Sequence, residues 1–151
     1  MKIIKATLEH SREIFNWRND LQSRKMFISG DEVTWENHTN WYLRALDSDF
    51  KAIYIGKHSE VDELVGMVRF DIEVEQKSAE VSINLNPYWR GKRVSVDLLS
   101  LAIKRFRNNQ KIPLFSTVKK CNQASIKCFE RCNFTLLRQE DNLCFYELPS
   151  I

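Results

Sequence analysis

The chain has 151 residues, 43% of them hydrophobic and 28% charged, with four glycines and three prolines. This composition excludes a disordered or collagen-like chain, and the length predicts one domain over residues 1–151 with a packed core. The 23 Lys and Arg exceed the 20 Asp and Glu by only three, which argues against a nucleic-acid partner but leaves open a local basic patch for a phosphorylated ligand.

The N-terminal stretch, Met1 to Glu9, alternates charged and aliphatic residues, so no signal peptide is visible, and no stretch has membrane-spanning length. We therefore expect a cytoplasmic protein without a membrane partner. The cysteines crowd the last third of the chain without a C-x-x-C pair, and the histidines lie far from them in sequence. We expect buried, reduced thiols and no metal site, for Cys121, Cys128, Cys132 and Cys144.

The N-terminal part, from Ile3 to Trp41, has a mostly helical pattern. Ser11 is the candidate N-cap of one helix, and Thr34 is the candidate N-cap of a second. A polar connector over residues 18–25 lies between them and is either solvated surface or the wall of a polar ligand site. The later predicted elements are strands over 50–56, 64–73 and 79–85, a helix over 94–107, a strand over 113–118, a helix over 122–132, and a hairpin of 134–138 with 144–148.

The sharpest feature is the turn that joins the strand over 79–85 to the next helix. A helix start offers unpaired amide N–H groups and a partial positive charge to an anion. Arg90, Lys92 and Arg93 add three cations at this helix end, where positive charge is normally unfavourable. We interpret the turn as a candidate diphosphate site, the alternative being a plain basic helix start.

This turn resembles the pyrophosphate loop of the GNAT superfamily of acyl-CoA-dependent N-acetyltransferases, Arg/Gln-x-x-Gly-x-Gly/Ala. Arg93 and Ser95 stand at two motif positions that usually hold small residues. The resemblance implies acetyl-CoA as co-substrate and no metal. The residues that it implies at the CoA diphosphate are Arg90, Gly91, Lys92, Arg93, Val94 and Ser95.

A second stretch, residues 116–134, resembles the family's strand, Asn-x-x-Ala/Ser turn and following helix. Asn133 replaces the family's glycine and is the other residue that tolerates a left-handed helix end. Phe129 replaces a tyrosine that protonates the departing CoA thiolate in many members, and a phenyl ring cannot do so. Similarity to the ribosomal-protein N-acetyltransferases assigns that role to Ser125 and a CoA contact to Asn122; ordinary capping of the helix is the alternative.

A third stretch, Ile14 to Asp20 with Arg24 and His38-x-x-Trp41, is similar to the opening of aminosugar N-acetyltransferases. These enzymes act in the pathways to pseudaminic acid and related nonulosonates, which serve flagellin glycosylation. The resemblance implies a UDP-linked 4-amino-4,6-dideoxy sugar as acceptor, and guanidinium groups suit its diphosphate. The candidate acceptor-binding residues are Trp17, Arg18, Asn19, Arg24, Lys25, His38, Trp41 and Arg69.

Acetyl transfer needs a neutral amine, an oxyanion stabiliser and a route for the amine proton. The resemblance places the stabilising backbone N–H near Asn84 and Leu85, before a proline that cannot pair within a central strand. Glu80 is the candidate base by family position, and His38 is the candidate by its ordinary pKa of about 6.5. Alternatively, Glu80 forms a cross-strand ion pair and His38 is a polar residue of an amphipathic helix.

Together the resemblances predict an α+β fold: a single GNAT-like domain with a mixed, mostly antiparallel sheet of about six to seven strands, splayed in the middle, and helices on both faces. The predicted function is direct acetyl transfer from acetyl-CoA to the 4-amino group of the UDP-linked sugar, by a monomer or homodimer. The alternatives are an N-acetyltransferase for protein N-termini, which would need an open acidic groove, and a catalytically silent acyl-CoA-binding module.

Overall fold

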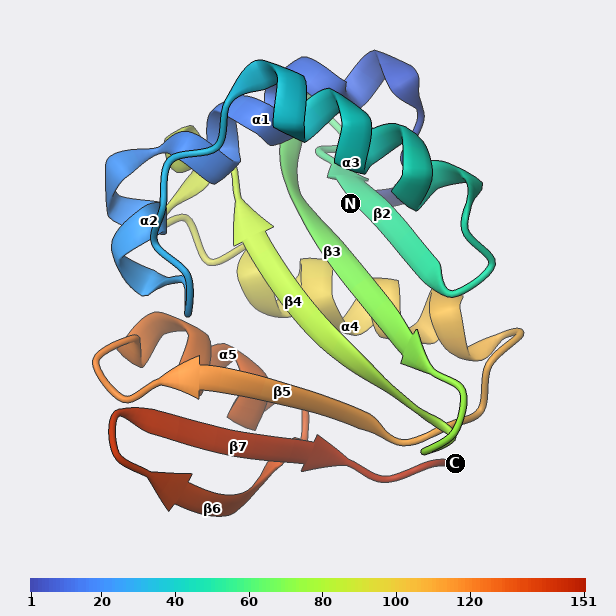
Figure 1. The fold of residues 1–151 in the computed structure, drawn as a ribbon, viewed down its shortest axis with the longest axis vertical. Helices are drawn as coiled ribbons and strands as arrows, with labels where there is room; N and C mark the ends of the chain where they lie inside the picture. The colour runs from blue at the N-terminus through green and yellow to red at the C-terminus, as the bar shows by residue number, and fades with distance from the viewer.

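The computed structural model describes residues 1–151 and contains one seven-stranded sheet in the order β1-β2-β3-β4-β5-β7-β6 (Figure 1). The strands are β1 (Lys2–Lys5), β2 (Lys51–Lys57), β3 (Leu64–Glu73), β4 (Ser78–Leu85), β5 (Leu114–Lys119), β6 (Thr135–Glu140) and β7 (Leu143–Leu148). The helices are α1 (Ser11–Asn19), α2 (Leu21–Met26), α3 (Trp35–Asp47), α4 (Ser95–Arg107) and α5 (Gln123–Arg131), with short 3-10 turns at Leu8–His10 and Pro87–Trp89.

The sheet opens between its fourth and fifth strands. Strands β1 to β4 form an antiparallel meander, and β5, β7 and β6 form a second antiparallel group. Strand β4 pairs in parallel with β5 at only two positions, Ala79 with Leu114 and Glu80 with Phe115, after which the two strands diverge (Figure 1). The predicted mixed, mostly antiparallel and splayed sheet is thereby confirmed.

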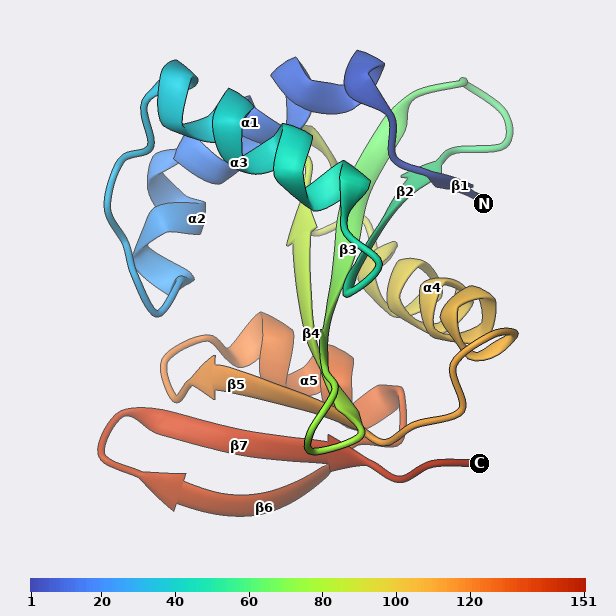
Figure 2. The same ribbon diagram turned by 45° about the vertical axis from the view of Figure 1, so that its right-hand side comes forward.

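Helices cover both faces of the sheet, and each face has its own hydrophobic core. Figure 2 shows α1 and α3 on one side of β2 to β4 and α4 on the other. The first core joins α1 and α3 to the sheet through residues such as Trp17, Tyr42 and Ile55. The larger core surrounds α4 and α5, where Phe106 stacks on Phe70 with ring centroids 4.1 Å apart. None of the helices combines the length and apolar character needed to cross a bilayer.

Several local predictions for the N-terminal part are wrong. Residues Lys2–Lys5 form a strand because they pair with β2, although they fall within a stretch that has a mostly helical pattern. The connector contains helix α2, which Asp20 caps by accepting a hydrogen bond from the Ser23 N–H at 3.0 Å. Ser11 is the first residue of α1 and not its cap, because the turn at Leu8–His10 runs directly into the helix.

Other local predictions agree with the structure. Thr34 caps α3, its side chain accepting a hydrogen bond from the Asn37 N–H at 3.2 Å. All four cysteines are free thiols, and three of them are buried as expected. Cys121 is exposed, so the prediction of burial is wrong there, because this residue lies in the turn between β5 and α5 and outside the core.

Candidate active site

A cavity of about 490 Å³ occupies the place where β4 and β5 part. Its walls come from α1, the segment after α2, α3, the cavity faces of β3 and β4, β5 and the start of α5. The predicted site residues that line it are Arg18, His38, Trp41, Arg69, Glu80, Asn84, Asn122, Ser125 and Phe129. The fold thus brings parts of the N-terminal stretch and of the 116–134 stretch to one cavity, together with strand β4.

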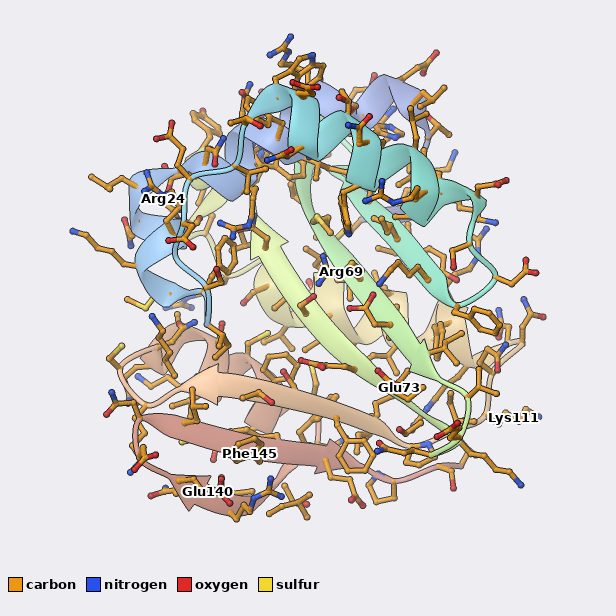
Figure 3. The ribbon with its side chains drawn as sticks, in the orientation of Figure 1. Arg24, Arg69, Glu73, Lys111, Glu140 and Phe145 are labelled. Carbon is orange, nitrogen blue, oxygen red and sulfur yellow. The ribbon has the colours of Figure 1, made fainter.

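The remaining predicted residues lie outside the cavity wall. Trp17 is buried in the core beneath α1, and the Asn19 side chain exchanges two hydrogen bonds with the backbone of Val33. Figure 3 shows Arg24 on α2, at the outer side of the molecule, whereas Arg69 lies centrally on β3. The others outside the wall are Lys25, Leu85, Arg90, Gly91, Lys92, Arg93, Val94 and Ser95.

Strand β4 leaves peptide groups unpaired along the gap. The Ala79 N–H donates to the Pro113 carbonyl on the β5 side, and the Asn86 N–H donates to the Val65 carbonyl on the β3 side. Because successive N–H groups of a strand point to opposite sides, those of Ile83 and Leu85 face the gap. Of the two residues predicted near the oxyanion, Leu85 therefore directs its N–H toward the gap and Asn84 contributes its side chain to the cavity wall.

His38 is a buried histidine at the inner wall of the cavity, only 3% exposed. Its Nε2 atom lies 3.0 Å from the carbonyl oxygen of Ser11 and 3.1 Å from the Ser11 hydroxyl. Because a carbonyl oxygen only accepts, Nε2 carries the proton and Nδ1 keeps its lone pair. Burial lowers the pKa of His38; the Ser11 contact opposes this shift, and the charge of Arg12 adds to it. The ring is therefore neutral near pH 7.

Glu80 is exposed on the cavity face of β4 and forms no ion pair. Asp71, which lies opposite Glu80 on β3, forms ion pairs with the nearby Lys51 and Arg69 instead. The Lys51 Nζ lies 2.8 Å from one carboxylate oxygen of Asp71, and the Arg69 Nε lies 3.2 Å from the other. The Glu80 carboxylate is thereby left free to accept a proton or a hydrogen bond from an amine.

Two guanidinium groups give the acceptor side of the cavity a positive wall. Arg18 lies over the Phe27 ring at 4.5 Å and donates from Nη2 to the Ser29 carbonyl at 3.0 Å, while its buried Nη1 has no hydrogen-bond partner. Arg69 lies over the Trp41 ring at 5.2 Å. Burial lowers the pKa of Arg18, and the charges of Arg24 and Arg69 lower it further. This unpaired donor suits an anionic group of a ligand.

Hydroxyl groups line the opposite wall, on β5 and α5. Asn122 caps α5 by accepting a hydrogen bond from the Ser125 N–H at 3.2 Å, while the Ser125 hydroxyl faces the cavity without a partner in the chain. Phe129 is buried beneath it, and its ring packs edge to face on Phe134. Sequence reasoning missed Ser116 and Thr117 of β5 in this wall. Their position on the predicted strand beside the gap was the signal that could have identified them.

The turn before α4 has the geometry of an anion site. Gly91 and Arg93 have positive φ angles of 71° and 61°, which fold the backbone sharply into the helix. Helix α4 begins after Val94 without any side-chain cap, so its first N–H groups keep their donors free. Lys92 and Arg93 are exposed beside them. These free donors and cations fit a diphosphate group, as the sequence predicts for this turn.

No cluster of three or more His, Cys, Asp or Glu side chains is arranged to hold a metal ion. The polar groups of this site are amides, guanidinium groups, hydroxyls, one imidazole and one carboxylate. This set matches the chemistry of amine acylation, which needs a proton acceptor, an oxyanion donor and a proton donor for the leaving group.

Comparison with known proteins agrees with this geometry. The sequence profile of the acetyltransferase (GNAT) family matches residues 12–134. A search of curated proteins finds no matching sequence. Among solved structures, N-acetyltransferase PseH of Campylobacter jejuni with acetyl coenzyme A is similar, with a TM-score of 0.74 and 19% identity over 98% of this chain and 97% of that chain.

Two other solved structures share the fold. Spermidine N-acetyltransferase of Vibrio cholerae, in complex with CoA and spermine, has a TM-score of 0.84 and 15% identity over 97% of this chain and 92% of that chain. Ribosomal-protein-alanine N-acetyltransferase of Brucella melitensis has a TM-score of 0.80 and 18% identity over 99% of both chains. The chain therefore belongs to the acetyltransferase (GNAT) family and is an acetyl-CoA-dependent N-acetyltransferase.

Proposed function

We propose that the protein transfers the acetyl group of acetyl-CoA directly to the 4-amino group of a UDP-linked 4-amino-4,6-dideoxy sugar, in nonulosonate biosynthesis of the pseudaminic acid type. The observation that carries this proposal is the positive acceptor wall. The unpaired Nη1 of Arg18 and the neighbouring guanidinium of Arg69 suit a sugar diphosphate and repel a polyamine. Such a wall is also unsuited to the acidic groove that a peptide N-terminus would require.

The proposed acceptor of the amine proton is His38 or Glu80. The amine nitrogen attacks the thioester carbonyl carbon, and its proton passes to the Nδ1 of His38 or to the Glu80 carboxylate. The neutral state of His38 and its fixed Nε2–H favour it as the acceptor. Glu80 offers a carboxylate without a competing cation.

The proposed oxyanion donor is a peptide N–H on the open edge of β4, at Ile83 or Leu85. As the carbon–sulfur bond breaks, Ser125 donates its hydroxyl proton to the sulfur, and the proton that His38 or Glu80 took from the amine returns to the Ser125 oxygen through water. This assignment rests on the free Ser125 hydroxyl and on Phe129, which offers no proton at the neighbouring position.

The direct test is free-thiol release from acetyl-CoA with a panel of three amines. These are a UDP-4-amino-4,6-dideoxy sugar, a peptide with a ribosomal-type N-terminus, and spermidine. We expect release with the sugar and little release with the other two. Release with the peptide or spermidine alone would overturn the substrate assignment while leaving the acetyltransferase assignment in place.

A further inference from the structure

Arg90 stands at a position that the sequence resemblance assigns to the CoA diphosphate, yet its guanidinium group contacts the start of α2. Its Nη2 bonds the Asp20 carboxylate and the Ser23 hydroxyl, the latter at 2.5 Å. Its Nη1 lies 3.3 Å from the side-chain oxygen of Gln22. Asp20 is the N-cap of α2, so Arg90 ties the turn before α4 to the beginning of another helix about 70 residues earlier.

Further contacts extend this connection to the cavity. The hydroxyl of Ser23, a buried residue, lies 3.4 Å from the side-chain oxygen of Asn84, which lines the cavity on β4. At the other end of α2, the Lys119 Nζ donates to the Lys25 carbonyl at 3.0 Å. Helix α2 is thus held at its start by Arg90 from the turn before α4 and at its end by Lys119 of β5.

The helix held in this way leads directly into the acceptor wall. The last residue of the helix, Met26, and the segment that follows it, from Phe27 to Ser29, line the cavity opposite β4 and β5. The Phe27 N–H donates to the Ser23 carbonyl of α2 at 3.2 Å, and the side chains of Arg18 and Arg24 donate to the backbone carbonyls of Ser29 and Gly30. A change in the position of α2 therefore moves the surface that meets the acceptor.

The Asp20–Arg90 pair is partly buried and remains charged at neutral pH. Both side chains are about one quarter exposed, with relative accessibilities of 26% and 27%. Burial raises the pKa of Asp20, but hydrogen bonds from Arg90 and from the Ser23 N–H outweigh it and hold the pKa below its ordinary value. The carboxylate is therefore charged across the neutral pH range and keeps its charge-assisted bonds to Arg90.

We propose that Arg90 is a positioning residue that couples the acetyl-CoA loop to the acceptor wall. Binding of the CoA diphosphate to the free N–H groups at the start of α4 orders the 90–94 turn. The ordered turn fixes the Arg90 side chain, which fixes Asp20 and Ser23 and with them α2. Acetyl-CoA binding thereby fixes α2 and the segment that follows it. The proposal depends on the acetyltransferase assignment and not on the identity of the acceptor.

The test is hydrogen exchange of the whole protein, followed by mass spectrometry, with and without saturating acetyl-CoA. In the natural protein we expect acetyl-CoA to slow exchange in peptides covering α2 and residues 26–33 by about fivefold or more, the lower end of ordinary coupling between sites. Asp20→Asn keeps a side-chain oxygen for the Ser23 N–H and loses the charge that holds Arg90. Asp20→Asn and Arg90→Ala should both abolish the slowing in α2 while retaining it in the 90–94 turn.

Arg93→Ala is the matched control, because Arg93 lies in the same turn, is exposed and, unlike Arg90, forms no hydrogen bond to α2. This variant should need more acetyl-CoA for saturation and then show the full slowing in α2. Calorimetry of acetyl-CoA binding separates the two roles of Arg90. If Arg90 served the diphosphate, Arg90→Ala would weaken binding and Asp20→Asn would tighten it. Such opposite effects, or slowing of α2 exchange that persists in Asp20→Asn, would overturn the proposal.

Discussion

Replacing Arg18 by methionine removes the guanidinium of the acceptor wall while keeping a long, apolar side chain over the Phe27 ring. Two contacts are lost: the predicted bond from the unpaired Nη1 to the acceptor diphosphate, and the Nη2 bond to the Ser29 carbonyl. We expect weaker binding of the UDP-linked sugar and unchanged binding of acetyl-CoA, because Arg18 lies away from the turn before α4.

The size of the effect follows from these contacts. A hydrogen bond from a charged donor contributes about 1.5–3 kcal/mol. Since about 1.4 kcal/mol corresponds to a factor of ten, kcat/KM for the sugar should fall about 10- to 100-fold. The lost bond to the Ser29 carbonyl adds about 1 kcal/mol or less through a looser Met26–Ser29 segment.

The assay is free-thiol release at varied sugar concentration, with calorimetry of acetyl-CoA binding alongside it. Arg24→Met removes an equivalent bond, from Arg24 Nε to the Gly30 carbonyl at 3.1 Å, outside the cavity wall. This variant measures what a lost backbone bond costs by itself, about fivefold or less. Arg44→Met, an exposed position on α3 without side-chain contacts, should leave kcat/KM unchanged within about twofold. If Arg18→Met loses no more activity than Arg24→Met, the diphosphate role of Arg18 is wrong.

Three further predictions concern proton transfer and the core. Because burial lowers the pKa of His38, the acid limb of the kcat/KM profile should lie below about pH 6.5, with activity falling as the pH decreases. His38→Gln should remove this limb and lower kcat/KM by about 100-fold or more, whereas an acid limb that survives in the variant would assign the base to Glu80. Ser125→Ala should lower kcat by about 100-fold with acetyl-CoA affinity nearly unchanged in calorimetry, and an unchanged kcat would remove Ser125 from the mechanism. Phe106→Ala should lower the free energy of unfolding by about 3–5 kcal/mol in urea titrations, because Phe106 is 2% exposed and its ring stacks on Phe70. A loss below about 1 kcal/mol would contradict the described packing.

The sequence predicted the elements whose residues repeat with a clear period. Helix α4 has apolar residues at 98, 99, 102, 103 and 106, all of which are buried, and its predicted start differs from the observed one by one residue. Strand β1 has only four residues and two apolar side chains, too few for a period to appear. Helix α2 is polar almost throughout and depends on the Asp20 cap, so its pattern is that of a loop.

The candidate site was predictable where side-chain chemistry or the family resemblance indicates a role. His38, Glu80 and Ser125 were chosen as proton-transfer groups, and the fold places all three at one cavity. What the sequence could not indicate is which charged groups are already paired. Arg90 pairs with Asp20 across the fold, whereas Glu80 remains free because Asp71 takes both nearby cations. Such choices depend on long-range geometry, which leaves no periodic signal in the chain.

The two-residue contact between β4 and β5 also has a consequence for folding cooperativity. Backbone pairing joins the β1–β4 group to the β5–β7 group only at Ala79 and Glu80. Cohesion between the two groups therefore comes from side chains of the larger core, which contains Val81 of β4 and Leu114 of β5 around α4. A ligand arm bound between the open strand edges would add contacts to the backbone that the polypeptide itself does not make. Binding of such a ligand would then link the two groups, and they would unfold as one unit.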